Sequence, residues 1–201
     1  MPIALIDYGA GNLASVRKGF AAVDGDLVTP ASPAALADFD GIVVPGVGHF
    51  AASTALAGGW SEAIARRVEA GVPVLGICLG MQWLFEGSEE APEIAGLGAF
   101  AGRCARIEVE RPLKVPHVGW NTLEIIRESQ ALEGIADGTQ VYFTHSFAAP
   151  VTPECVARTS HGSSFAAVVQ RDNVAGVQFH PEKSGAAGLT ILRNFVAMTR
   201  R

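Results

Sequence analysis

The sequence predicts a single α/β domain over residues 1–201, with a central, mostly parallel sheet, helices on both faces and antiparallel strands added later in the chain. Apolar runs at 3–6, 41–44 and 72–78 are typical of parallel strands, which are buried on both faces. Segments with helical spacing of apolar residues alternate with these runs, as in a sheet covered by helices. From about Arg103, short β-rich runs separated by Gly, Pro, Asp and Asn indicate antiparallel additions.

The expected elements follow from these patterns in chain order. In the first half they are a strand at 3–6, a helix through 13–23, strands at 26–29 and 41–44, a helix at about 60–70, a strand at 72–78 and a helix at 79–85. In the second half they are strands at 104–109, 120–126, 140–143, 155–159, 165–170 and 174–179, and a helix at 188–198.

Composition excludes several classes of protein. A net charge of -5 and no cluster of lysine or arginine argue against a nucleic-acid or anionic membrane partner. The three cysteines form no CxxC pair, so neither a disulfide framework nor a thiolate metal site is suggested, and a reducing cytosol fits best. The N-terminal apolar run meets Asp7 too early for a signal peptide, and no apolar run reaches membrane-spanning length.

Cys78 ends an apolar run, lies between Gly76 and Gly80, and precedes a helical segment. This pattern is typical of a nucleophile elbow, a sharp strand-to-helix turn that presents a side chain at the carboxyl edge of a sheet. A sulfur near a helix N-terminus is favoured as the thiolate, so Cys78 is a candidate nucleophile. The alternative is a buried core cysteine, because free cysteine is among the most buried residue types.

A partner for the cysteine occurs about a hundred residues later. His180 and Glu182 follow another apolar run, and in extended chain residues two apart share a face. Pro181 between them biases His180 away from helix. Cysteine, histidine and acid at the ends of distant strands make a nucleophile, a base and a group that orients the base. His-Pro-Glu alone is weak evidence, but together with the elbow it favours a catalytic site.

Two glycine loops need separate interpretation. Residues 9–14 match the dinucleotide fingerprint G-x-G-x-x-A, but no acid ends the second strand to hold a ribose, so we reject a nucleotide cofactor. The loop Pro-Gly-Val-Gly at 45–48 is no phosphate-binding P-loop. It is either ordinary turn chemistry or, beside the elbow, a source of a second N–H for an oxyanion hole with the Leu79 amide.

The motif Gly-Ile-Cys-Leu-Gly-Met-Gln at 76–82, together with His180-Pro-Glu182, resembles the triad glutamine amidotransferases. Within that class, further segments are similar to the glutaminase subunits of imidazole glycerol phosphate synthase, and the resemblance covers essentially the whole chain. These segments are 6–16, 45–48, 118–121 (Val-Gly-Trp-Asn), 142–146 (Tyr-Phe-Thr-His-Ser) and 178–184 (Gln-Phe-His-Pro-Glu-Lys-Ser).

The resemblance implies a flavodoxin-like fold and one half of a two-part enzyme of histidine biosynthesis, in the cytoplasm. This chain would hydrolyse glutamine to glutamate and ammonia with no cofactor and no metal. A separate (β/α)8-barrel cyclase subunit, bound as a heterodimer, would use the ammonia to make imidazole glycerol phosphate and AICAR from the nucleotide PRFAR. The complex as a whole would then be a lyase.

The resemblance also implies residue roles. Cys78 would attack the side-chain amide, His180 would protonate the departing ammonia and then activate water, and Glu182 would hold His180. Gly46, Val47 and Leu79 match the oxyanion region, where a peptide flip near Val47 completes the hole only when the cyclase is occupied. The residues that match substrate contacts are Gln82, Ser146 and Phe147.

Asn12, Trp120 and Lys183 match the face toward the cyclase. From the residues alone, Asn12 is equally a helix-capping residue, Trp120 a core aromatic and Lys183 a solvated charge. The other candidates near the motifs have structural interpretations. His117 and His145 are expected to be hydrogen-bonded structural histidines, and Cys104 and Cys155 packing residues. His49, where a small residue is expected, and Phe147, which lacks an expected hydroxyl, depart from the family pattern.

Three rival functions stay open. The glutaminase component of anthranilate synthase typically has Pro-Gly-Pro-Gly in the loop and histidine after the elbow, and Val47 and Met81 disagree with both. A stand-alone cysteine hydrolase of related architecture is the second rival, because an elbow cysteine does not choose a substrate. A non-enzymatic scaffold or a Rossmann-type binding module is the least favoured, because all three triad residues are present.

Overall fold

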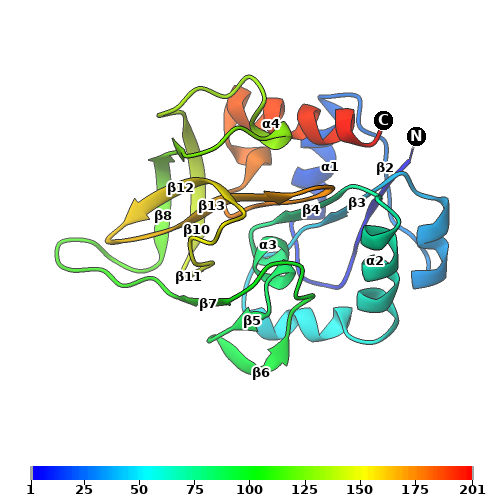
Figure 1. The fold of residues 1–201 in the computed structure, drawn as a ribbon, viewed down its shortest axis with the longest axis horizontal. Coiled ribbons are helices and arrows are strands. Elements are labelled where there is room, and N and C mark those ends of the chain that lie inside the picture. The colour runs from blue at the N-terminus through cyan, green and yellow to red at the C-terminus, as the bar shows by residue number, and fades with distance from the viewer. Residues whose placement is uncertain (1, 201) are drawn as a thin grey trace.

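In the computed structural model, which describes residues 2–200, an eight-stranded sheet separates two layers of helices (Figure 1). The helices are α1 (Leu13–Ala21), α2 (Gly59–Glu69), α3 (Leu79–Leu84) and α4 (Gly185–Met198). Short 3-10 helices are η1 (Pro33–Asp38), η2 (Phe50–Leu56), η3 (Gln130–Leu132) and η4 (Pro181–Lys183). Figure 1 places α1 and α4 on one face of the sheet and α2 and α3 on the other.

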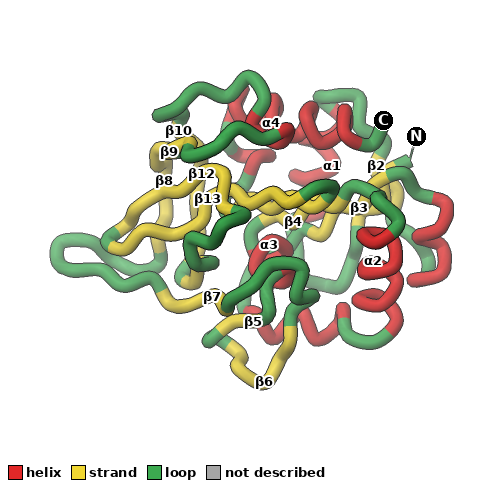
Figure 2. The backbone as a smooth tube through the Cα atoms, viewed as in Figure 1, coloured by secondary structure: helices red, strands yellow, loops and turns green. Residues whose placement is uncertain are grey.

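Figure 2 shows the strands in yellow and the helices in red. The first-half strands are β1 (Ile3–Leu5), β2 (Leu27–Val28), β3 (Gly41–Val44), β4 (Val74–Ile77), β5 (Gly87–Ser88) and β6 (Ala91–Ala95). The others are β7 (Arg103–Arg106), β8 (His117–Thr122), β9 (Glu124–Ile125), β10 (Gln140–His145), β11 (Phe147–Ala148), β12 (Cys155–His161), β13 (Ser163–Arg171) and β14 (Val174–Val177).

The sheet order is β2-β1-β3-β4-β14-β13-β12-β9. The pairs from β2 to β14 are parallel, and those from β14 through β13 and β12 to β9 are antiparallel. This confirms the predicted fold class. The last strand, β14, inserts beside β4, so the segments that follow these two strands emerge at the same sheet edge. Two further sheets are separate from it, a two-stranded sheet, β10-β8, and a four-stranded sheet, β11-β7-β5-β6.

Alternation of apolar side chains builds the two cores. Ile3 and Leu5 of β1 pack with Phe20 and Phe195 on the α1 and α4 face. Ala4 and Ile6 belong to the opposite cluster, with α2 and α3. Because successive side chains of a strand point to opposite faces, a fully apolar strand supplies both layers.

The structure corrects two expectations about strands. The run 120–126 is not one strand but β8 and β9, which belong to different sheets, because the chain turns at the buried Leu123. The Leu123 N–H bonds the Thr139 carbonyl at 2.9 Å, and its own carbonyl accepts from Gly138. The β5-β6 hairpin was not predicted at all, since its glutamates and Pro92 have low strand propensity.

Residues 2–200 were also searched for membrane-spanning segments. No helix among them is long and apolar enough to cross a bilayer.

Candidate active site

Cys78 occupies the turn between β4 and α3. Its backbone has φ 53° and ψ -108°, in a region where a non-glycine residue is strained by about 1–3 kcal/mol. The backbone is held on both sides: the Cys78 N–H donates to the Val177 carbonyl at 2.8 Å, and the Cys78 carbonyl accepts from the Gln82 N–H at 3.1 Å. The predicted elbow is therefore present, with the cysteine between a strand and a helix.

The flanking glycines are required by space. A Cβ on Gly80 would lie 1.8 Å from the carbonyl oxygen of Val44, and one on Gly76 would lie 2.7 Å from that of Gly80. Real side chains do not approach backbone oxygens so closely. The helix after Cys78 thus passes directly over the neighbouring strand ends, which only glycine permits.

His180 and Glu182 meet directly after β14. His180 Nδ1 lies 2.9 Å from Glu182 Oε1, and both side chains are only 2% exposed. They meet through the 3-10 turn η4, closed by a 3.0 Å bond from the Lys183 N–H to the His180 carbonyl, and not through the extended chain that we expected. Pro181 starts that turn because its fixed φ suits the first helical position.

The environment of His180 favours its charged form. Burial opposes the charge, but the neighbouring Cys78 sulfur and the Glu182 carboxylate outweigh it and raise the pKa of His180 to about 9. Among residues 2–200, His180 Nε2 is buried without a hydrogen-bond partner of normal geometry. Nε2 is therefore available to exchange a proton with a group bound beside the Cys78 sulfur.

A cavity of about 270 Å³ is lined in part by Cys78. Drug-sized ligands occupy about 300–1,000 Å³, so this cavity suits a small metabolite. Predicted substrate residues Gln82, Ser146 and Phe147 all line it. The other lining residues are Gly48, Glu90, Pro116, Thr144 and His145.

Glu90 is the residue that sequence analysis missed. It lies in the turn of the unpredicted β5-β6 hairpin, and one of its carboxylate oxygens accepts the Phe50 N–H at 2.7 Å. The hairpin places this carboxylate in the cavity lining, although Glu90 is more than ten residues after Cys78 in the chain. Only recognition of the hairpin would have signalled it.

Gln82 links the cavity wall to Cys78. Its side-chain nitrogen donates to the Phe147 carbonyl at 2.8 Å and to Gln178 Oε1 at 3.1 Å. Gln178 in turn directs its Nε2 at the Cys78 sulfur, 3.7 Å away. At position 147 the backbone carbonyl accepts the hydrogen bond from Gln82, so the absence of a side-chain hydroxyl at Phe147 removes none of these contacts.

The predicted oxyanion hole of Gly46, Val47 and Leu79 is closed in this structure. The Leu79 N–H donates to the carbonyl oxygen of Gly46 at 3.3 Å. Because a trans peptide points its C=O and N–H in opposite directions, the N–H of Val47 faces away from the Leu79 amide. A rotation of that one peptide would replace the carbonyl with an N–H. A Cβ on Gly46 would lie 2.8 Å from the Leu79 Cβ, so this loop needs glycine.

The three residues predicted to face a partner lie at the surface. Asn12 caps α1, with its Oδ1 accepting the Ser15 N–H at 3.2 Å. Trp120 is 54% exposed, which excludes a core aromatic. Lys183 is exposed and lies with its Nζ 6.0 Å from the ring centre of Tyr142.

The remaining cysteines and histidines have packing or structural surroundings. Cys104 and Cys155 are buried, and burial raises the pKa of Cys155 to about 11. His49 caps η2 by accepting the Ala51 N–H at 3.1 Å. His117 and His145 are hydrogen-bonded to each other at 3.1 Å, as expected of structural histidines. Within residues 2–200 no group of three or more His, Cys, Asp or Glu side chains is arranged to hold a metal ion.

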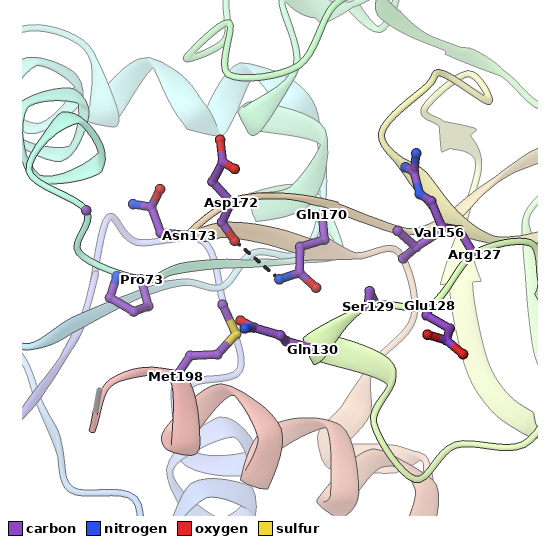
Figure 3. Close-up of a pocket in the computed structure, with 11 residues that line it drawn as sticks. Pro73, Arg127, Glu128, Ser129, Gln130, Val156, Gln170, Asp172, Asn173 and Met198 are labelled. Carbon is purple, nitrogen blue, oxygen red and sulfur yellow. Dashed lines mark hydrogen bonds between the residues drawn. The ribbon is translucent and has the colours of Figure 1, made fainter.

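A cavity of about 490 Å³ lies at the opposite edge of the sheet (Figure 3). It is lined by Pro73 and Asn173, which precede β4 and β14, and by Met198 at the end of α4. Cys78 and His180 follow the same two strands, so the two cavities are at opposite strand ends. No residue of the predicted site lines this second cavity.

Comparison with known proteins agrees with this geometry. The family model for glutamine amidotransferase class-I matches residues 4–198. Two similar proteins, from Methanothermobacter thermautotrophicus and Halobacterium salinarum, are each named imidazole glycerol phosphate synthase subunit HisH. The first is 45% identical, covering 98% of this chain and 99% of its own, and the second is 47% identical, covering 96% and 92%.

Solved structures show the same fold at low identity. A glutamine amidotransferase crystal structure matches 98% of this chain and 99% of its own with a TM-score of 0.76 and 19% identity. A Trypanosoma brucei CTPS glutaminase domain with bound acivicin matches 100% and 94% with a TM-score of 0.70 and 17% identity. The chain belongs to the class-I glutamine amidotransferase family, and within it to the group of the HisH subunits of imidazole glycerol phosphate synthase.

Proposed function

We propose that this chain hydrolyses glutamine to glutamate and ammonia, and that the ammonia is used by the cyclase subunit of an imidazole glycerol phosphate synthase in histidine biosynthesis. The observation that carries the proposal is that Cys78 lines the cavity and follows β4, while His180 and Glu182, 2.9 Å apart, follow the adjacent parallel strand β14, in a chain of this family. The relatives' printed name supports the choice of enzyme, because it describes a subunit of that synthase.

The chemistry divides into two balanced steps. In the first, the Cys78 sulfur attacks the side-chain amide carbon of glutamine, and the His180 imidazolium gives its Nε2 proton to the departing nitrogen, which leaves as ammonia. In the second, neutral His180 takes a proton from water as the water attacks the thioester carbon. The sulfur leaves as the thiolate, His180 is protonated again, and the new side-chain carboxylic acid loses its proton to water to give glutamate. Glu182 holds the ring and stabilises its charge throughout.

The cavity offers groups suited to the amino-acid end of glutamine. The Glu90 carboxylate suits the α-ammonium group by charge, and the polar backbone of Ser146 and Phe147 lies on the same wall. Loss of the Glu90 charge in Glu90→Gln should therefore raise the KM for glutamine at least about tenfold, since a charge-assisted hydrogen bond contributes about 1.5–3 kcal/mol.

The closed oxyanion hole supports a partner-dependent enzyme. With the Leu79 N–H bonded to Gly46, a tetrahedral oxyanion has no donor, and one missing donor costs about a hundredfold to a thousandfold in rate. We propose that a (β/α)8-barrel cyclase subunit binds the face bearing Asn12, Trp120 and Lys183, forms a heterodimer, and drives the peptide between Gly46 and Val47 to rotate. The half-exposed Trp120 is suited to be an interface anchor.

The test is glutamate release by the chain alone and with the cyclase subunit, with and without that subunit's nucleotide ligand. We expect slow turnover alone and strong stimulation by the liganded partner. Cys78→Ala should remove turnover in every condition, and Cys78→Ser, of nearly equal size, controls for packing. Rapid turnover unaffected by the partner would favour a stand-alone hydrolase, and stimulation only by an anthranilate synthase partner would favour that rival.

A further inference from the structure

Three polar side chains form a hydrogen-bonded row beside the cavity. His117 and His145 lie directly opposite each other on the antiparallel strands β8 and β10. His117 Nδ1 is 3.1 Å from His145 Nε2, and His117 Nε2 is 3.3 Å from Asn121 Nδ2. At the other end, His145 Nδ1 is 2.9 Å from the carbonyl oxygen of Phe147. The row therefore runs from β8 to the wall of the substrate cavity.

The direction of every bond in the row follows from its ends. A carbonyl oxygen only accepts, so His145 Nδ1 carries a proton and its Nε2, in a neutral ring, accepts. His117 Nδ1 must then donate and its Nε2 accept. Asn121 supplies that last donor, and its nitrogen is identified by a second 3.0 Å bond to the Ser160 carbonyl. Both histidines are thus neutral with the proton on Nδ1.

Packing prevents the two rings from turning away. His117 and His145 are 4% and 7% exposed. The His117 ring is stacked between the rings of Phe143 and His161, with centroid distances of 4.9 and 4.2 Å. The His145 ring meets that of Phe165 edge-on, with their centroids 5.0 Å apart. A second proton on either ring would aim two N–H groups at one another, and burial also lowers the pKa values to about 4 for His117 and 3 for His145.

The carbonyl at the end of the row has a second donor, Gln82 Nε2, at 2.8 Å. Phe147 is thus held from two sides, by the row and by the residue that links to Gln178 and the Cys78 sulfur. A displacement of this carbonyl would move both Gln82 and the cavity wall that includes Ser146.

The opposite face of β8 is exposed and apolar. Val118 and Trp120 are 56% and 54% exposed, while Asn121 and His117 point to the other face, because side chains alternate along a strand. A partner that binds Val118 and Trp120 therefore contacts the same strand, β8, that bears Asn121 and His117.

We propose that Asn121, His117 and His145 are positioning residues: a directed, neutral relay that fixes the Phe147 carbonyl and couples the position of β8 to glutamine binding beside Cys78. This inference rests on the proposed function for its substrate, but the relay itself does not. It adds to the proposed partner face a physical connection from Trp120 to the cavity wall.

The tautomers provide a test that needs no substrate. Long-range proton–nitrogen correlation NMR of the isolated chain at neutral pH should show His117 and His145 as neutral rings protonated at Nδ1, against the usual Nε2 form in water. A charged ring or an Nε2 proton on either histidine would overturn the relay. If the wild-type complex released no glutamate, the proposed function would fail while this result still decided the relay.

Two variants of His145 separate its two bonds in the complex with the cyclase subunit. In His145→Asn the amide nitrogen replaces Nδ1 and keeps the bond to Phe147, whereas in His145→Gln the amide reaches only toward His117. We expect His145→Gln to raise the KM for glutamine about fivefold to tenfold with kcat changed less, because a neutral hydrogen bond is lost. His145→Asn should raise KM less than about half as much. Equal effects would overturn a positioning role.

His161→Phe is the matched control, because it keeps an aromatic ring stacked on His117 and removes the bond between His161 and the Lys114 carbonyl, which lies outside the row. Its KM for glutamine should match wild type. Coupling is tested by combining Trp120→Ala with His145→Gln. The two effects on KM should deviate from additivity by at least about threefold, since coupled residues interact energetically, and additive effects would contradict transmission through β8.

Discussion

Two buried histidine sites lie at neighbouring strand ends of this molecule, and they have opposite charge states. His180 is 2% exposed, His117 4% and His145 7%, so burial disfavours charge at all three. The Cys78 sulfur and the Glu182 carboxylate beside His180 raise its pKa to about 9, whereas His117 and His145 bond each other, an amide and a carbonyl, with the His161 ring stacked on His117. The chemistry of the partner atoms, and not burial, decides whether a buried histidine transfers protons or holds a position.

The largest expected difference between the two sites is in turnover. His180→Asn should lower kcat for glutamine at least about a thousandfold, because it removes the proton donor and base. His117→Asn, which keeps a donor at the Nδ1 position, should change kcat less than about tenfold. Steady-state glutamate release by the complex with the cyclase subunit measures both. Similar losses for both variants would remove the distinction between a proton-transferring and a positioning histidine.

The partner of His180 provides the next comparison. Glu182→Gln keeps the shape of the side chain but loses the charge that favours imidazolium, so we expect kcat to fall about a hundredfold to ten-thousandfold and the pKa of His180 to fall from about 9. Titration of the His180 ring by NMR and kinetics of the same variant check both. An unchanged pKa of His180 would mean that the Glu182 carboxylate does not contribute to raising it.

Stability should depend on pH in opposite ways at the two sites. The raised pKa of His180 contributes stability that is fully present below its ordinary value of 6.5 and is lost as pH rises through about 9. The lowered pKa values of His117 and His145 contribute stability present above 6.5 and lost as pH falls toward about 4 and 3. Denaturant unfolding across this range should therefore give a maximum near neutral pH.

Variants identify each limb of that curve. In His180→Asn, the decrease in the free energy of unfolding between pH 6.5 and 9 should be smaller by about 1–3 kcal/mol, since one pKa unit is about 1.36 kcal/mol. The decrease at acid pH should not change. His145→Asn should reduce only the acid limb. A wild-type curve with no change between pH 6.5 and 9 would contradict the charged state of His180.

The smallest expected effect contrasts a partnered buried group with an unpartnered one. The buried Tyr8 hydroxyl has no hydrogen-bond partner among residues 2–200, so Tyr8→Phe should change the free energy of unfolding by less than about 0.5 kcal/mol or stabilise the chain. His145→Phe leaves the Nδ1 donor of His117 unpaired and should cost about 1–3 kcal/mol. Chemical denaturation of the two variants measures both free energies of unfolding. Equal losses would show that the hydrogen-bonded row does not stabilise the fold.

Much of the site was predictable because its signals are local in sequence. Cys78 between Gly76 and Gly80 indicates a strand-to-helix turn whatever surrounds it, and His180 and Glu182 lie only two residues apart. The fold class was predictable for the same reason, since wholly apolar strands alternating with helices bury both faces of a sheet. The run 120–126 was wrongly predicted as one strand because its apolar residues do not record the turn at Leu123.

Only the tertiary structure decided what depends on which segments become neighbours. The sequence determined the turn that bears Cys78, but not that the Gly46 carbonyl occupies the Leu79 amide, that Glu90 reaches the cavity, or that His117 bonds His145. The first and last of these contacts join segments at least 28 residues apart, and Glu90 lies in a hairpin that was not predicted. Propensity and spacing report on neighbours along the chain, whereas hydrogen-bond direction and access to a cavity are set by the packing of distant strands.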